Sequence, residues 1–352
     1  MRKYIGCDAH QKYSVFVAMN EAGEYGKAVR VENRRAELRT FLRQIPAGTP
    51  VAVEASGGWY WLIDELEAAG LDARLANPTE AKKRMPGRNK TDERDARGLA
   101  LLLRNQTLPE VWIPPAPLRD LRGLLRTRLA LRNDRTRVKN RIHATIRRYG
   151  LRDDSLKDLF TGKARVRLSV YIGSLPEETR EAALHEWMLV DELSGYLKQL
   201  EARLAERLKN EPQWRLLKTL PGVGLILGAT LHLEIGDVGR FPTAMHLASY
   251  AGLTPLVHAS GGRTHLGPTS KRSNHYLRWA FVEAANCIVS HQKELGEQHV
   301  VCLYRRLAAR KGHAKAAVAV GRHLAEASWW MLTKGDPYRA PSQRVETSSE
   351  IG

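Results

Sequence analysis

The chain has 352 residues with 56 Lys and Arg against 38 Asp and Glu, which gives a formal net charge of +18. Its 43% hydrophobic and 27% charged residues are typical of a folded globular protein, not of a disordered or fibrous one. No apolar run approaches the roughly 20 residues needed to span a bilayer, and Asp8 stands where a signal peptide needs its apolar stretch. The three cysteines lie far apart without a Cys-x-x-Cys pair, which argues against a disulfide framework and a zinc site.

These features predict a cytoplasmic protein without a membrane segment. At roughly 100–200 residues per domain, the length predicts two or three domains. The excess positive charge predicts a polyanionic partner, most simply a nucleic acid.

Predicted strands and helices alternate along the first hundred residues. The apolar pattern predicts strands at 4–7, 14–18, 27–31, 51–54 and 73–76, and helices at 35–45, 61–69 and 92–104. The resulting order, β-β-β-α-β-α-β-α, is that of a ribonuclease-H-like domain, although other α/β domains share much of it. We therefore expect an α/β domain of this kind over residues 1–111.

Positive charge is concentrated in the segment that follows. Residues 1–111 contain 18 basic and 15 acidic residues, whereas residues 118–150 contain 11 basic and two acidic ones. The proline-rich run 112–117 cannot continue a helix and predicts a domain boundary. The density of arginine favours phosphate contact, because the forked guanidinium matches phosphate oxygens. A helical spacer with a solvated basic face is the alternative.

The remainder of the chain has a helical pattern. Apolar residues recur at helical spacing around Val138–Tyr149 and again over 186–209, and two amphipathic segments separated by a loop predict a helical hairpin or coiled coil. We expect a basic helical linker over 112–210 and a mainly α-helical domain over 211–335. The Pro- and Ser-containing tail, 336–352, is expected to be disordered.

Four carboxylates of the first domain are candidate metal ligands. Asp8 and Glu54 end expected strands, while Asp92 and Asp95 are three residues apart and share one helix face. If they converge at one edge of a sheet, they repel one another unless cations neutralise them. Hard oxygen ligands select Mg²⁺ or Mn²⁺, and two such ions can stabilise both reacting oxygens of a phosphodiester. Taken singly, each acid has a structural alternative, such as Asp92 in a helix cap or first turn.

Two further motifs lie in the second half of the chain. Leu220-Pro221-Gly222-Val223-Gly224 precedes an apolar helix, and its glycines expose backbone N–H groups that can hold a DNA phosphate. A plain helix connector is the alternative. Ser260 precedes two glycines, which let another backbone approach closely, and is a candidate nucleophile. Ser249, Ser270 and Ser273 compete with it, although Ser249 lies in an apolar helical run and is expected to be packed.

Taken in order, these segments resemble the DEDD transposases of the insertion-sequence-110 family, including its 1111-type branch. The N-terminal motifs that carry the resemblance are Gly6-Cys7-Asp8-Ala9-His10, Val53-Glu54-Ala55-Ser56-Gly57, Ala76-Asn77-Pro78 and Lys90-Thr91-Asp92-Glu93-Arg94-Asp95-Ala96. Lys139-Asn140-Arg141-Ile142 is similar to the family's linker helix. The C-terminal motifs are Leu220–Gly224, Phe241–Ala244, Tyr250–Pro255, Ala259–Gly262 and Ser270–Arg278. The resemblance extends over about residues 1–335.

The resemblance implies a site-specific recombinase that excises and inserts its own element. At least some members are guided by a structured non-coding RNA, the bridge RNA, which pairs with donor and target DNA. It also implies a RuvC-like domain whose acids bind Mg²⁺ or Mn²⁺, and a serine in the transposase domain that attacks DNA to form a phosphoserine intermediate. On this chain the acids are Asp8, Glu54, Asp92 and Asp95, and the serine is Ser260.

Acids and serine would then lie in different domains, so we expect another protomer of a dimer or tetramer to complete the site. The 211–335 domain would carry a helix-hairpin-helix-like turn. Candidate nucleic-acid contacts are Arg135, Lys139, Arg141, Gly222, Gly224, Lys271, Asn274 and Arg278. Ser273 stands where the family commonly has glycine, and His10 where many members have serine; we leave His10 out of the predicted site. A RuvC-like Holliday-junction resolvase that uses water, or a non-catalytic nucleic-acid-binding protein, are the alternative functions.

Overall fold

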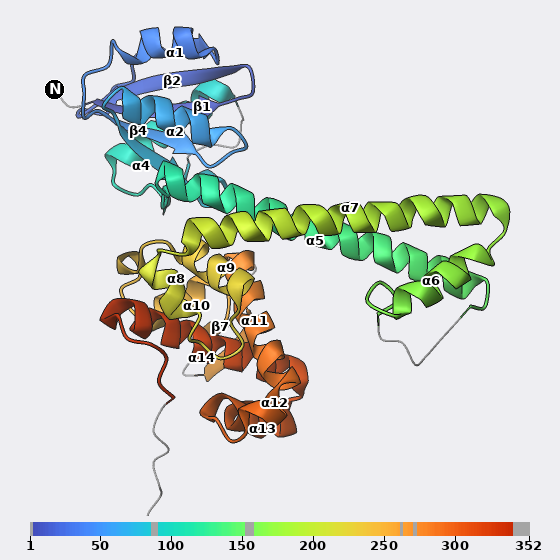
Figure 1. The fold of residues 1–352 in the computed structure, drawn as a ribbon. Coiled ribbons are helices and arrows are strands. Elements are labelled where there is room, and N and C mark those ends of the chain that lie inside the picture. Colours follow the sequence, from blue (N-terminus) through green and yellow to red (C-terminus); the bar gives the residue numbers. More distant parts are fainter. Residues whose placement is uncertain (1–2, 86–90, 152–157, 261–262, 270–272, 341–352) are drawn as a thin grey trace, which may run out of the picture. The chain divides into compact units, whose positions relative to one another are not determined.

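The computed structural model describes residues 3–85, 91–151, 158–260, 263–269 and 273–340. The chain divides into two compact units, 1–116 and 117–352 (Figure 1). Within the described residues, none of the helices combines the length and the apolar character needed to cross a membrane. Each unit is taken by itself below.

A mixed six-stranded sheet forms the centre of the first unit. Its strands lie in the order β3-β2-β1-β4-β5-β6. Their bounds are β1 (Lys3–Ala9), β2 (Tyr13–Asn20), β3 (Val29–Glu32), β4 (Pro50–Glu54), β5 (Asp72–Ala76) and β6 (Glu110–Val111). The pairs β1–β4 and β4–β5 are parallel, whereas β1–β2, β2–β3 and β5–β6 are antiparallel. Because β1 and β4 are parallel neighbours, their carboxyl ends meet at the same edge of the sheet.

The described residues of this unit form the helices α1 (Arg35–Leu42), α2 (Trp59–Ala68), α3 (Pro78–Arg84) and α4 (Asp92–Arg104). Apolar side chains of α1 and α2 form one core with alternate residues of β1 and β4, such as Cys7 and Val53. Leucines of α4 and Ala81 of α3 form another core with Ala52 and Ala76. Successive strand residues point to opposite faces, so the two cores cover the two faces of the sheet.

Gly6 allows α4 to pack closely on β1. A Cβ atom at this position would lie 1.9 Å from the Ala96 carbonyl oxygen and 2.6 Å from the Ala100 nitrogen. A side chain at position 6 would therefore force the helix backbone away from the strand. The close contact holds the first turn of α4 near the carboxyl end of β1.

The second unit contains a pair of long helices, α5 (Ala116–Arg148) and α7 (Glu177–Leu208), with α6 (Ala164–Gly173) between them in sequence (Figure 1). One apolar cluster joins Leu125 of α5 to Leu204 of α7, and another joins Ile142 to Val190. Because positions rise along α5 as they fall along α7, the two helices run antiparallel. Tyr149, at the end of the expected apolar stripe, is exposed.

The rest of the second unit is mainly α-helical. Its elements are α8 (Pro212–Leu217), α9 (Leu225–Ile235), the 3₁₀ helix η1 (Val238–Arg240), α10 (Ala244–Tyr250), α11 (His275–Ser290), α12 (Gln292–Leu295), α13 (His299–Lys311) and α14 (His313–Lys334). Leu231, Phe281 and Leu324 belong to the core shared by α9, α11 and α14. The strands β7 (Pro255–Ser260) and β8 (Arg263–Thr269) pair antiparallel, which the sequence analysis did not predict.

The elements expected in the first hundred residues are all present, and α3 and β6 are additional. The predicted boundary at 111/112 lies close to the observed division at 116/117. A further division at 210/211 stays a prediction. Of the tail predicted to be disordered, residues 336–340 have no regular secondary structure, and residues 341–352 lie outside the described residues.

Candidate metal centre

Two carboxylates follow adjacent strands at the carboxyl edge of the sheet. In the parallel register, Gly6 is opposite Ala52 and Cys7 is opposite Val53. Asp8 and Glu54 therefore come next on their respective strands. Cys7 and Val53 are fully buried, which fixes the register because a slip of one residue would turn apolar side chains out of the core.

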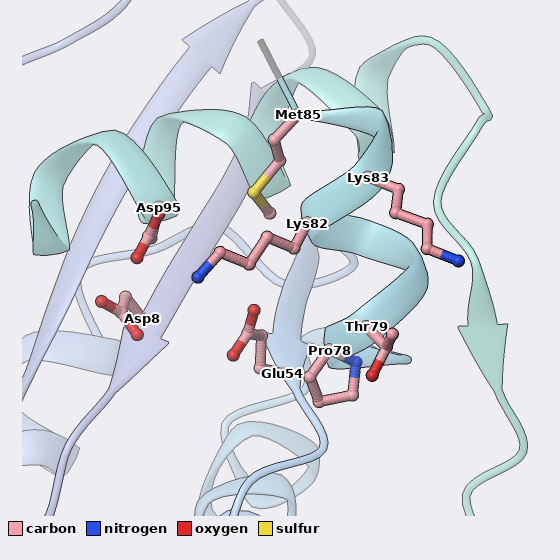
Figure 2. Close-up of a pocket in the computed structure, with 8 residues that line it drawn as sticks. All are labelled: Asp8, Glu54, Pro78, Thr79, Lys82, Lys83, Met85 and Asp95. Atoms are coloured by element: carbon pink, nitrogen blue, oxygen red, sulfur yellow. The ribbon is translucent and has the colours of Figure 1, made fainter. Parts of the chain in front are cut away.

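Helix α4 brings two further carboxylates. The Thr91 side chain accepts a hydrogen bond from the Arg94 backbone N–H at 3.3 Å and so caps the helix. Asp92 and Asp95 consequently both lie in its first turn. Asp95 lines a pocket of about 480 Å³ together with Asp8 and Glu54 (Figure 2).

The surroundings of Asp8 disfavour the charged form of its carboxylate. It is only 8% exposed, and burial is the main reason why its pKa lies above the ordinary value. The negative charges of Asp95 and Asp92 raise this pKa further, while His10 lowers it. A cation near Asp8 would relieve both the burial of charge and the repulsion.

Asp92 belongs to a second group that also includes Asp8. The His10 Nε2 atom lies 3.2 Å from Asp8 Oδ2 and 3.2 Å from Asp92 Oδ1. One ligand atom from each of these three residues lies within 4.8 Å of the others. The Tyr13 hydroxyl donates a hydrogen bond of 2.8 Å to Asp92 Oδ2, and this bond is the main reason why the pKa of Asp92 lies below its ordinary value.

The residues at this edge fit a divalent cation. They offer carboxylate oxygens, which suit Mg²⁺ and Mn²⁺, and one imidazole nitrogen, which suits transition metals. The His10 Nε2 atom is buried, and it faces the carboxylate oxygens of Asp8 and Asp92, each at 3.2 Å. A buried ring nitrogen facing two carboxylate oxygens is a suitable arrangement for sharing a cation with them.

Sequence reasoning omitted His10 and missed Tyr13. The spacing Asp8-x-His10 was a usable signal, because residues two apart along an extended segment point to the same side. The role of Tyr13 could not be predicted from local sequence, because it depends on the tertiary structure. A 2.9 Å hydrogen bond from the His10 N–H to the Tyr13 carbonyl closes the turn between β1 and β2. That turn brings the phenol back to Asp92.

The candidate nucleophile belongs to the second unit. Ser260 is the last residue of β7 and is paired with Arg263 of β8, while the two glycines that follow it lie outside the described residues. Among the competing serines, Ser270 is also outside the described residues. Ser249 is exposed on α10, so the expectation that it packs in the interior is wrong.

The predicted nucleic-acid contacts on α5 all have partners within the protein. Arg135 donates to the Ser194 hydroxyl at 3.3 Å, Lys139 Nζ is 3.4 Å from an Asp158 oxygen, and Arg141 donates to Glu186 at 2.6 Å. Arg141 is exposed and its ion pair contributes little energy, so it can exchange Glu186 for a phosphate, whereas Arg135 and Lys139 are half-buried. Their contact with nucleic acid stays a prediction.

Asn274 has a structural role that the sequence analysis did not anticipate. Its Oδ1 atom accepts hydrogen bonds of 3.0 and 3.1 Å from the backbone of Tyr276 and Leu277, which caps α11. Its Nδ2 group donates at 2.9 Å to Glu234, a fully buried carboxylate that also receives two hydrogen bonds from Arg126. These bonds explain the residue without nucleic acid, and its predicted contact stays untested.

Gly222 also has a structural explanation. Its φ is +75°, and a Cβ atom there would lie 2.3 Å from the Ala284 carbonyl oxygen on α11. Gly224 is the residue before α9 and faces open space. Arg278 lies on α11, and Lys271 falls outside the described residues. The predicted contacts of these four residues with nucleic acid remain predictions.

Comparisons with known proteins identify the family. A model of the DEDD transposase of IS110 matches residues 5–150, and a model described as the transposase IS116/IS110/IS902 family matches residues 214–300. The four acids lie within the first match and Ser260 within the second. Both matches therefore include the residues singled out above.

Individual relatives agree with the family models. The chain is 26% identical over 320 residues to the transposase for insertion sequence element IS1111A of Coxiella burnetii, covering 90% of this chain and 86% of the relative. It is 27% identical over 315 residues to a probable family 20 transposase of Pseudomonas aeruginosa, covering 87% and 90%. Over a shorter stretch of 143 residues it is 34% identical to the insertion element IS110 uncharacterized 43.6 kDa protein of Streptomyces coelicolor, covering 40% and 34%.

Membership of a transposase family implies an enzyme that cleaves and rejoins DNA, and the DEDD type suggests the use of a divalent metal. The edge of the sheet described above has the donor groups for such an ion. The chain belongs to the IS116/IS110/IS902 family of insertion-sequence transposases.

Proposed function

We propose that this transposase is a site-specific recombinase that cuts and rejoins DNA through a phosphoserine intermediate, with a RuvC-like, ribonuclease-H-like first unit. The observation that carries the proposal is the gathering of Asp8, Glu54 and Asp95 around one pocket, with Asp92 beside Asp8 through His10. Three antiparallel strands followed by two parallel ones, with helices on both faces, agree with the proposed fold.

In this proposal the four acids hold Mg²⁺ or Mn²⁺ at the edge of the sheet. The bound metal supplies Lewis-acid polarisation of the scissile phosphate. Asp8 is common to both groups of ligands, Tyr13 orients Asp92 through its hydrogen bond, and the buried position of Asp8 limits access of bulk water.

Ser260 is the proposed nucleophile. Its Oγ atom forms a new bond to phosphorus while one of the two bridging P–O bonds to the sugars breaks; the serine loses its hydroxyl proton, and the departing sugar oxygen takes up a proton and leaves as a free hydroxyl. The covalent link conserves the energy of the phosphodiester, so strands can be rejoined without ATP. Ser260 ends β7 and is followed in the sequence by two glycines, which leave room for a DNA backbone to approach.

A structured non-coding bridge RNA is the proposed guide, pairing with donor and target DNA. The 11 basic residues of 118–150 support contact with nucleic-acid phosphates. Because acids and serine belong to different units, we propose a dimer or tetramer in which one protomer supplies acids and another the serine.

A trapping experiment tests the proposal. Protein, RNA recovered from a host carrying the flanking non-coding DNA, a labelled element junction and Mg²⁺ are combined and run on a denaturing gel. We expect a protein-linked DNA band that is lost in Ser260→Ala and in Asp8→Ala. Nicked DNA that survives Ser260→Ala would instead indicate the attack of water, as in a junction resolvase. DNA binding without cleavage by any preparation, Mn²⁺ included, would favour a non-catalytic nucleic-acid-binding protein.

A further inference from the structure

Helix α3 directs one lysine toward the carboxylate pocket. Figure 2 shows the Lys82 ammonium pointing into the space bordered by Asp8, Glu54 and Asp95. The neighbouring Lys83 points away in the same view. Lys82 therefore approaches the acids from α3, which carries none of them.

The other basic residues of this helix are engaged elsewhere. Lys83 Nζ lies 3.2 Å from a Glu80 carboxylate oxygen, and Arg84 donates a hydrogen bond of 2.7 Å to the Thr107 carbonyl. Within the described part of the chain, no hydrogen bond or ion pair holds the Lys82 ammonium. Of the three, Lys82 is the one available to a ligand that enters the pocket.

Local structure holds α3 in place at this pocket. The Asn77 side chain accepts a hydrogen bond of 3.1 Å from the Glu80 N–H, and Pro78 begins the helix. Ala81 is fully buried in the core beneath it. Just after the helix, Met85 packs closely on Gly98 of α4. A Cβ atom at position 98 would lie 2.7 Å from the Met85 Cγ. The backbone beneath Lys82 is therefore fixed against α4, while its four-carbon stem remains free to swing.

An ammonium group in this position has two possible anionic partners. Without a metal, the crowded carboxylates favour a nearby positive charge. Once they hold a divalent cation, the same ammonium is repelled by that cation, and the oxygens of a DNA phosphate become its strongest partner. A lysine is suited to both, since it is a compact point charge with three donors on a flexible stem.

We propose that Lys82 is the phosphate-binding group of this site, and that it neutralises the carboxylates until the metal and the DNA arrive. The ammonium then binds a non-bridging oxygen of the scissile phosphodiester. This inference rests on the proposed function, and it adds a residue that contacts the substrate from α3, a helix that carries none of the four acids.

Metal binding by the full-length protein without DNA tests the first half. The affinity for Mn²⁺ is measured by electron paramagnetic resonance of the free ion for wild type, Lys82→Ala, Lys82→Arg and Lys83→Ala. We expect Lys82→Ala to bind Mn²⁺ more tightly by on the order of tenfold, because a competing charge is gone. Lys82→Arg and Lys83→Ala should remain close to wild type. An unchanged affinity in Lys82→Ala would overturn the proposed competition.

The second half is tested by the rate of covalent adduct formation in a single turnover at saturating Mn²⁺, where differences in metal affinity no longer matter. Without the ammonium that contacts the phosphate, Lys82→Ala should form the adduct roughly 10²-fold more slowly than wild type. Lys82→Arg should recover part of this rate, and Lys83→Ala should react at the wild-type rate. A wild-type rate in Lys82→Ala would exclude phosphate binding. Absence of any adduct in wild type would count against the proposed function, while the Mn²⁺ affinities would still decide the role of Lys82 toward the acids. Thermal unfolding of each variant verifies the fold.

Discussion

His10 Nε2 lies 3.2 Å from Asp8 Oδ2, so the segment that supplies the first acid of the site also supplies its nearest ring nitrogen. Asp92 closes this group from α4, and Tyr13 fixes Asp92 from β2. The carboxylates around the pocket therefore do not have equivalent surroundings. Asp8 is shared, Asp92 has the imidazole beside it, and Glu54 and Asp95 face Lys82 (Figure 2).

Replacement of His10 by Ala should weaken the binding of Mn²⁺ more than that of Mg²⁺. An imidazole nitrogen favours transition metals, whereas Mg²⁺ prefers oxygen ligands and keeps much of its water. We expect a loss of roughly tenfold or more for Mn²⁺, measured by calorimetric titration of the full chain. His185, which is exposed on α7, provides the matched control in His185→Ala. Equal losses for both metals would show that the ring acts only as a spacer between the two acids.

Gly6→Ala should destabilise the first unit. The new methyl group would meet the backbone of α4 at 1.9 Å, which neither the strand nor the helix can avoid by a side-chain movement. We expect a loss of about 3 kcal/mol or more in the free energy of unfolding, measured by urea denaturation. Gly57→Ala is the control, because the space around a Cβ at that position is open. Similar stability in both variants would mean that α4 does not depend on this contact.

Arg126→Ala should unfold the second unit more readily by about 3 kcal/mol. Glu234 is fully buried, and the variant removes two hydrogen bonds of 2.9 and 3.0 Å from its carboxylate. Arg122, at 3.9 Å, and Asn274 would remain. The control Glu206→Gln removes an exposed pair with Lys209 and should change stability by less than about 1 kcal/mol. If denaturation curves show equal shifts for the two variants, burial of Glu234 is not the source of its importance.

Glu65→Gln should lower stability at neutral pH but not in acid. Glu65 is buried on α2 and receives hydrogen bonds of 2.5 and 3.0 Å from Arg39, which are the main reason why its pKa lies below the ordinary value. Because the pKa is lower in the folded state, the stabilisation is complete above the pKa of the unfolded chain, about 4.3. It is lost as the pH falls through the folded-state pKa.

Urea denaturation at a series of pH values from 7 to 3 checks this expectation. The difference in unfolding free energy between wild type and Glu65→Gln should shrink as the pH falls below about 4. A constant difference over this range would show that Glu65→Gln destabilises the fold through poorer packing or hydrogen-bond geometry and that the charge of Glu65 does not contribute.

Much of the first unit could be predicted because its strands are short apolar runs bounded by polar residues. Val51-Ala52-Val53 reads as a strand with both faces covered, and it occupies the middle of the sheet. The register between β1 and β4 then determines where Asp8 and Glu54 lie. Their positions at strand ends were therefore available from the sequence.

Other features depended on contacts between distant residues. Tyr13 reaches Asp92 across 79 positions, and no local pattern announces such a contact. Lys82 could have been found, since Asn77-Pro78 is a typical beginning of a helix, but its direction toward the acids depends on how α3 packs. Strand β8 lacks a clear alternation, because glycine and proline interrupt it, and β7 begins at a proline.

The parallel register of β1 and β4 also has a consequence for how such a chain can change in length. In the connection between α1 and β4, the backbone first bonds to the segment before β5 at Gly48, whose N–H donates to the Gly70 carbonyl, so an insertion at 43–47 leaves the register of β4 unchanged. A single residue inserted within β4 itself would shift the register of Glu54 relative to Asp8 and turn the Glu54 carboxylate to the opposite face of the sheet. Deep mutational scanning with insertions should therefore find tolerance at 43–47 and a sharp boundary at Gly48.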